Sequence, residues 1–155
     1  MAKGLHFEDI DVGMRFESRP MEVTGDEVLE FARRYDPQPF HTDPAAAKDT
    51  FFREWVASGW HTSALSMRLV VETVPIEGGV IGGGVDELRW PNALRPGDTI
   101  RLVVEVIEKR TLKSRGDIGL VKVRMTTLNQ RGEAVQTMIP NLFAPLRAAA
   151  VPAPG

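Results

Sequence analysis

An acid and an imidazole stand five residues apart in the stretch Tyr-Asp-Pro-Gln-Pro-Phe-His-Thr-Asp, which runs from Tyr35 to Asp43. Pro37 and Pro39 stiffen the backbone between Asp36 and His41. A carboxylate and an imidazole that point into one pocket can act as a general acid and a general base. The same residues also fit a polar loop in which the histidine satisfies local backbone groups, and both interpretations are open at this point.

The elements around this stretch determine where the two side chains can point. Thr24 to Glu27 fits a capping box, and apolar residues then recur at helical spacing. The predicted helix must end by Asp36, because Pro37 disfavours helical dihedral angles in the residue before it. We therefore expect the acid and the imidazole on a stiff loop that leaves a helix C-terminus. A second short helix is predicted to begin at Thr42 or Asp43.

A third helical segment is predicted from Trp60 to Val74. It is apolar on most of its circumference, which is typical of a buried helix. Arg68 and Glu72 are one turn apart and could pair with each other or mark a less buried side. Ser58 suits the N-cap position. Gly59 would then lie where a helix N-terminus presents free amides, or it could allow close packing.

In the second half of the chain, apolar residues recur at every second position. Alternating apolar residues run through 100–107 and 121–126, with turn signals between the runs. About four long antiparallel strands are expected, after a short strand near 14–23. One sheet wrapped around one buried helix gives an α+β fold in a single domain, residues 1–147. Residues 148–155 are small and proline-containing, and we interpret them as a flexible tail.

Composition excludes several classes of function. The 155 residues carry 19 basic and 21 acidic side chains and form no basic block, so nucleic acid is not an expected partner. No stretch has the length and apolarity of a membrane span, and no secretory signal is present, so we expect a soluble, cytoplasmic protein without a membrane partner. There is no cysteine, and the three histidines share no ligand spacing, so no metal site is predicted.

Five stretches of the sequence together carry a known pattern. They are Tyr35 to Asp43, Ala57 to Thr62, Leu88 to Pro91, Leu94 to Asp98 and Asn129 to Glu133. In this pattern the chain resembles the MaoC-like family of (R)-specific enoyl-CoA hydratases and acyl dehydratases. The resemblance implies a hot-dog fold, a long helix wrapped by a curved antiparallel sheet, and a homodimer or larger homo-oligomer.

The resemblance also implies an activity, the reversible hydration of a trans-2-enoyl-CoA to the (R)-3-hydroxyacyl-CoA. Asp36 and His41 would hold one water between them as a coupled acid/base pair, and the Gly59 amide would bind the developing oxyanion. No cofactor is expected, because coenzyme A is part of the substrate. Four further residues are predicted to contact the substrate: Phe40, Ser58, Trp60 and His61.

The chain departs from the usual family pattern at three places. Gln38 stands where the family commonly has Asn, and Ser58 stands where it commonly has His before the glycine. The segment from Phe51 to Trp55 is bulkier than usual, which bears on the shape of the substrate. Two other functions therefore stay open, a non-catalytic acyl-thioester-binding protein and a hot-dog thioesterase that uses Glu54 or Glu72.

Overall fold

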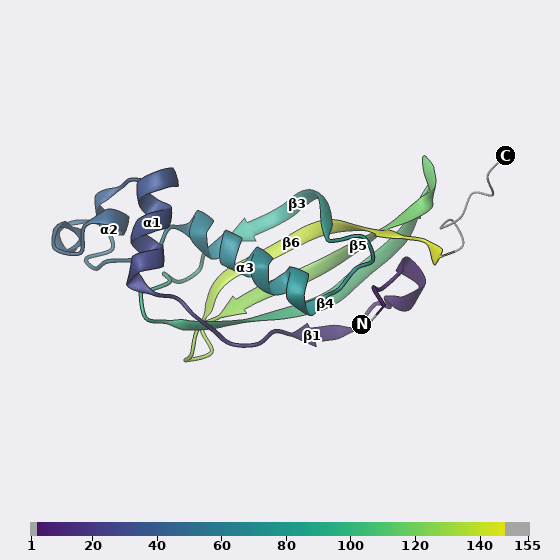
Figure 1. Ribbon diagram of the computed structural model, residues 1–155, viewed down its shortest axis with the longest axis horizontal. Coiled ribbons are helices and arrows are strands. Elements are labelled where there is room, and N and C mark those ends of the chain that lie inside the picture. Colours follow the sequence, from purple (N-terminus) through teal and green to yellow (C-terminus); the bar gives the residue numbers. More distant parts are fainter. Residues whose placement is uncertain (1–2, 148–155) are drawn as a thin grey trace.

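The computed structural model describes residues 3–147, in which one long helix lies across a face of a curved antiparallel sheet (Figure 1). The predicted tail, residues 148–155, lies outside the described residues. In chain order the elements are η1 (Phe7–Asp9), β1 (Arg15–Glu17), β2 (Met21–Glu22), α1 (Gly25–Tyr35), α2 (Pro39–Thr42), η2 (Ala46–Asp49), α3 (Gly59–Thr73), β3 (Ile81–Arg89), β4 (Thr99–Leu112), β5 (Arg115–Leu128) and β6 (Ala134–Pro145).

The strands form one sheet in the order β1-β4-β5-β6-β3, and β2 pairs with β4 beside β1. All pairings are antiparallel. The long central strands β4 and β5 form a hairpin, as alternating apolar residues with a short turn predict. This is the predicted α+β hot-dog arrangement. Over the described residues, no helix has both the length and the apolarity that crossing a membrane requires.

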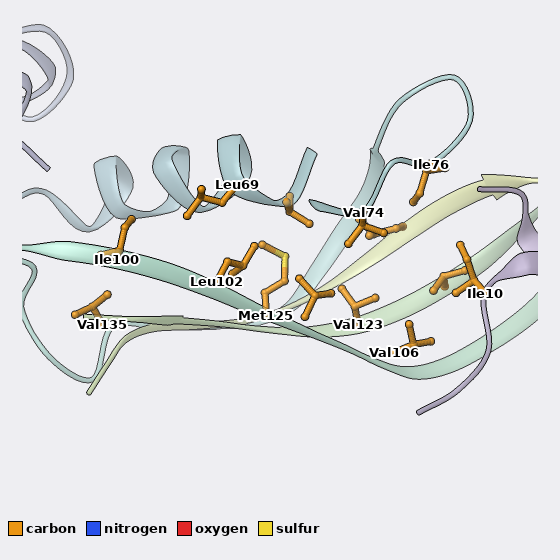
Figure 2. Close-up of a cluster of buried hydrophobic side chains, with 14 of the residues drawn as sticks. Ile10, Leu69, Val74, Ile76, Ile100, Leu102, Val106, Val123, Met125 and Val135 are labelled. Carbon is orange, nitrogen blue, oxygen red and sulfur yellow. The ribbon is translucent and has the colours of Figure 1, made fainter. Parts of the chain in front are cut away.

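The core lies between α3 and the concave face of the sheet (Figure 2). Every second residue of β4 from Ile100 to Val106 is buried, and the alternate residues of β5 from Val121 to Met125 meet them. Leu69 of α3 packs against this layer and is fully buried. The period-two pattern thus fixes which face of each strand is covered.

The prediction that α3 is buried nearly all round is wrong. Met67 and Val71 are 44% and 41% exposed. The sheet covers only one side of the helix, and no other described element covers the opposite side, so apolar character alone overestimated burial. Arg68 does pair with Glu72 across one helical turn, with 2.6 Å between Nε and Oε1.

The cap of α1 forms as predicted. Thr24 Oγ1 accepts a hydrogen bond from Glu27 N, and Glu27 Oε2 accepts one from Thr24 N. The next helix, however, begins earlier than Thr42. It is the single turn α2, with Pro39 in its first position, where the missing N–H and the fixed φ of proline suit a helix start. His41 therefore lies on a helical turn and not in an extended loop.

Candidate active site

Asp36 and His41 lie in direct contact. His41 Nε2 is 3.2 Å from Asp36 Oδ2, and the two side chains are only 6% and 17% exposed. Asp36 is the C-cap of α1, and the α2 turn brings the His41 ring back toward it. A separation of 3.2 Å leaves no room for a water between the two groups, so a shared water would have to approach both of them from one side.

The second nitrogen of His41 is held by the backbone. His41 Nδ1 is 2.8 Å from Val56 O, and a carbonyl can only accept, so Nδ1 must carry the proton of this bond. The Val56 segment is fixed along α2 because Val56 N donates to Phe40 O and Trp55 Nε1 donates to His41 O. The Nε2 atom therefore faces a carboxylate oxygen. One proton shared between Nε2 and Oδ2 satisfies both atoms.

Two hydrogen-bond donors, in addition to the neighbouring His41 ring, converge on the Asp36 carboxylate. Gln38 Nε2 donates to Oδ1 at 2.5 Å, and Ser58 Oγ donates to Oδ2 at 2.7 Å. Burial alone raises the pKa of the Asp36 carboxyl, but the two hydrogen bonds and the nearby His41 outweigh it and hold the pKa below its usual value. Gln38 and Ser58, the two departures from the usual family residues, thus both act on the same carboxylate.

A cavity of about 410 Å³ adjoins His41, whereas Asp36 is not among the residues that line it. His41 and Gly59 contribute to its lining, and Phe40, Phe52 and Trp90 are among its aromatic walls. No Lys, Arg, Asp or Glu side chain lines it. The cavity therefore suits an uncharged, apolar group beside the His41 imidazole. We call it the first cavity.

Gly59 is the first residue of α3, and Ser58 caps the helix by accepting from Trp60 N at 3.2 Å. Within residues 3–147, no hydrogen bond uses the Gly59 N–H, so it is available to a ligand in the first cavity. A Cβ at this position would lie 2.7 Å from Trp90 Cε2. The glycine is therefore needed for the close approach of the indole, as well as being placed to offer its amide.

The four residues predicted to contact the substrate lie in different environments. Phe40 lines the first cavity. Ser58 is buried behind it on the Asp36 carboxylate. Trp60 is 59% exposed and packs edge-to-face on Trp90, outside the lining. His61 faces α1 instead, where it stacks on Phe31 with 4.7 Å between ring centroids.

His61 is buried and does not line the first cavity. Its Nδ1 is buried without a hydrogen-bond partner among the described residues. Burial lowers the pKa of His61, and Glu27 offsets this only in part. Over residues 3–147, no cluster of three or more His, Asp or Glu side chains could hold a metal ion.

Sequence reasoning missed Gln136 of β6. This side chain is fully buried, and its Oε1 accepts from Trp90 Nε1 at 2.9 Å and from Ser63 Oγ at 2.6 Å. A glutamine within the apolar pattern of a strand was the available signal. Its partners lie 46 and 73 residues away in the chain, so the pattern could not name them.

A family model and several solved structures are similar to this chain. The MaoC like domain model matches residues 9–128. A MaoC-like dehydratase from Rhodospirillum rubrum is 43% identical and superposes with a TM-score of 0.89, covering 93% of this chain and 99% of its own. The (R)-hydratase PhaJ1 of Pseudomonas aeruginosa is 25% identical, with a TM-score of 0.75 over 98% of this chain and 96% of its own.

A protein of Bacillus subtilis, YdeM, is 27% identical over 128 residues, which are 82% of this chain and 89% of YdeM. The family model covers most of the hot-dog fold, including Asp36, His41 and Gly59. The solved relatives share nearly the whole fold with this chain. The chain belongs to the MaoC-like dehydratase family.

Proposed function

We propose that this protein is a hydro-lyase that adds water to a trans-2-enoyl-CoA and forms the (R)-3-hydroxyacyl-CoA. The observation that carries the proposal is the contact between Asp36 and His41, whose ring lines a cavity that also reaches the free Gly59 amide. Similarity to a MaoC-like dehydratase and to an (R)-hydratase supports it. The reverse reaction, dehydration, uses the same groups.

The pair can supply both proton transfers of hydration. The water oxygen forms a bond to C3 of the enoyl group, and one water proton passes to the pair. The pair returns one proton to C2, where the former double-bond electrons form the new C–H bond. Because His41 Nε2 and Asp36 Oδ2 are 3.2 Å apart, a proton gained at one atom can replace a proton lost at the other. The pair then ends with the charge it had at the start.

Negative charge develops on the thioester oxygen between these steps. The Gly59 N–H at the start of α3 is the donor we assign to it, since a helix N-terminus favours an anion and an oxyanion donor is worth about 10²–10³ in rate. The reaction so written needs proton transfer and one oxyanion donor. We therefore propose no cofactor beyond the coenzyme A of the substrate.

The test is the loss of enoyl absorbance when the protein is mixed with crotonyl-CoA and longer homologues. Asp36→Asn and His41→Ala should each lower kcat/KM by about 10²-fold or more, the lower end expected for a positioned acid/base group. A stereospecific 3-hydroxyacyl-CoA dehydrogenase then reports the configuration of the product. Undiminished turnover in both variants, or an (S) product, would refute the proposal.

The carboxylates that could serve a thioesterase are engaged elsewhere. Glu72 accepts from Arg19 Nε and Arg68 Nε, and these bonds lower its pKa to about 2. Glu54 accepts from Arg95 Nε with both carboxylate oxygens. Neither residue lines the first cavity. These contacts favour the hydratase over thioester hydrolysis, which would release free thiol.

We propose that the protein works as a homodimer joined at β3. Within the described chain β3 pairs only with β6, so its outer edge is free. Ile81 and Val85 of this strand are 58% and 50% exposed, and Met67 and Val71 extend the apolar surface onto α3. We expect the wild type to sediment as a dimer and Val85→Lys to sediment as a monomer. A wild-type protein that sediments as a monomer would exclude the proposed dimer.

A further inference from the structure

A second cavity, of about 230 Å³, lies between α3, the edge strand β3 and the strands β5 and β6. Its lining is almost wholly apolar and includes three methionines, Met67, Met125 and Met138. Methionine side chains are unbranched and adapt to ligands of varied shape. A hydrocarbon chain is the class of ligand that such a cavity suits.

The second cavity begins one helical turn beyond the first. On α3, Gly59 and Thr62 line the first cavity and Ser63 lines the second. On β6, Val135 lines the first cavity and Met138 lines the second. The two cavities are therefore neighbours along both elements, and whatever lies between them decides whether they are joined.

Three hydrogen-bonded side chains connect the linings of the two cavities, and we call them the partition: Trp90 lines the first cavity, Ser63 lines the second, and Gln136 bonds to both. Gln136 Oε1 accepts from Ser63 Oγ at 2.6 Å and from Trp90 Nε1 at 2.9 Å. Ser63 comes from α3 and Gln136 from β6, the two elements that line both cavities, and Trp90 directly follows β3. The hydrogen bond to Gln136 holds the half-exposed indole over Gly59, where it lines the first cavity.

Gln136 of the partition is a polar residue at a position where an apolar residue would pack without an unpaired polar group. Gln136 is 0% exposed, and its Nε2 is buried without a hydrogen-bond partner among the described residues. The orientation of the amide is set by the two donors that reach Oε1, so the unpaired Nε2 does not result from a reversed assignment. An unpaired buried amide is unfavourable. An aliphatic residue would avoid this cost, but it would not fix the indole.

We propose that the partition sets the length of the acyl chain: it confines a short acyl group to the first cavity, and its removal opens the second cavity to a longer chain. This inference rests on the proposed function, because it takes the first cavity as the site of the acyl thioester. Short-chain thioesters are then the substrate class of the wild-type protein. Trp90 and Gln136 are the residues that determine it.

The test measures binding and not turnover. Titration calorimetry gives the affinities of butanoyl-CoA and octanoyl-CoA, two saturated thioesters that cannot be hydrated, for the full-length protein. In the wild type, octanoyl-CoA should bind more weakly than butanoyl-CoA, because the partition leaves no space for the added methylenes at the end of the first cavity. In Trp90→Leu and in Gln136→Ala, the preference for octanoyl-CoA should rise by about tenfold or more, since burial of several methylenes is then possible.

A double variant identifies where the longer chain goes. Met67 lines the second cavity and is also part of the surface proposed to pair in the dimer, so Met67→Trp can fill the cavity, and sedimentation of this variant shows whether its dimer is kept. Trp90→Leu/Met67→Trp should return the preference to the wild-type value. An unchanged preference in both single variants, with their folding confirmed by thermal melting, would overturn the inference, as would a gain that survives Met67→Trp. Wild-type protein that binds neither thioester would instead overturn the proposed function, and the inference with it.

Discussion

Ser58 Oγ lies 2.7 Å from Asp36 Oδ2 and accepts from Trp60 N, so one hydroxyl both begins α3 and holds the carboxylate of the candidate acid/base pair. The same helix start carries the Gly59 amide. The proposed proton acceptor and the proposed oxyanion donor are thus fixed to each other through a single side chain. This coupling makes Ser58 a positioning residue whose loss should affect both stability and proton transfer.

Replacement of Ser58 by Ala removes both hydrogen bonds. Loss of the N-cap should lower the free energy of unfolding by about 1 kcal/mol. Loss of a donor should also raise the pKa of Asp36. Since the carboxylate must be ionised to take a proton, the acidic limb of the activity profile should move to higher pH. Ser58→Thr keeps the hydroxyl and should leave both properties near wild type.

Gln38→Ala separates these two effects. Gln38 is exposed and donates to the other oxygen of Asp36, but its side chain caps no helix. Its removal should shift the acidic limb in the same direction as Ser58→Ala with a smaller change in unfolding free energy. An acidic limb that stays in place in both variants would show that the pKa of Asp36 does not govern the reaction.

A Cβ on Gly59 should collide with Trp90. The ring atoms Cε2 and Cδ2 lie 2.7 and 2.8 Å from where that carbon would be. Gly59→Ala should therefore cost about 1–3 kcal/mol in urea unfolding, as overpacking does. In a Trp90→Leu background the same change should be neutral or stabilising, because alanine favours the helix. Equal costs in both backgrounds would contradict the contact.

His61 should make stability depend on pH. Burial lowers the pKa of His61 below 6.5 in the folded protein, so the unfolded chain binds more protons just below that pH. The stability contributed by the neutral ring is complete above about pH 6.5 and is lost as the pH falls toward the folded-state pKa. Melting temperatures between about pH 7.5 and 5 should fall more steeply in the wild type than in His61→Phe. If the melting temperatures of the wild type and of His61→Phe fall equally with pH, His61 does not cause the pH dependence.

Glu72→Gln distinguishes the hydratase from a thioesterase. Its carboxylate lies outside the first cavity and is held ionised by Arg19 and Arg68, with a pKa of about 2. The substitution should leave the hydration rate unchanged and should not alter the release of free thiol from acyl-CoA. A thiol-release activity that disappears in Glu72→Gln would favour the alternative function.

Local patterns predicted the parts of the fold that depend on neighbours in sequence. The capping box at Thr24 and the end of α1 before Pro37 follow from backbone chemistry within a few residues. The inward faces of β4 and β5 follow from the period of two. The family pattern picked out Asp36, His41 and Gly59, and the fold brings Asp36 and His41 into direct contact.

The remaining features depend on segments far apart in the chain. Nothing local to Ser58 indicated that it would meet Asp36, 22 residues earlier. The partition joins three elements, and its hydrogen bonds appear only once α3, β3 and β6 are packed. The exposed side of α3 was also missed, because hydrophobicity shows that a helix can be buried but not how much of it the sheet covers.

Asp36 is the residue that ends α1, where the aligned peptide dipoles leave partial negative charge. An anion at that end is electrostatically opposed by its own helix, and it is tolerated because donors from two other segments face it. A neutral amide would relieve this unfavourable interaction but would remove the carboxylate that the proposed reaction requires. Thermal stability and the proposed activity thus favour different residues at position 36. Substitutions meant to make the protein more heat-resistant while keeping it active should therefore be made at other positions.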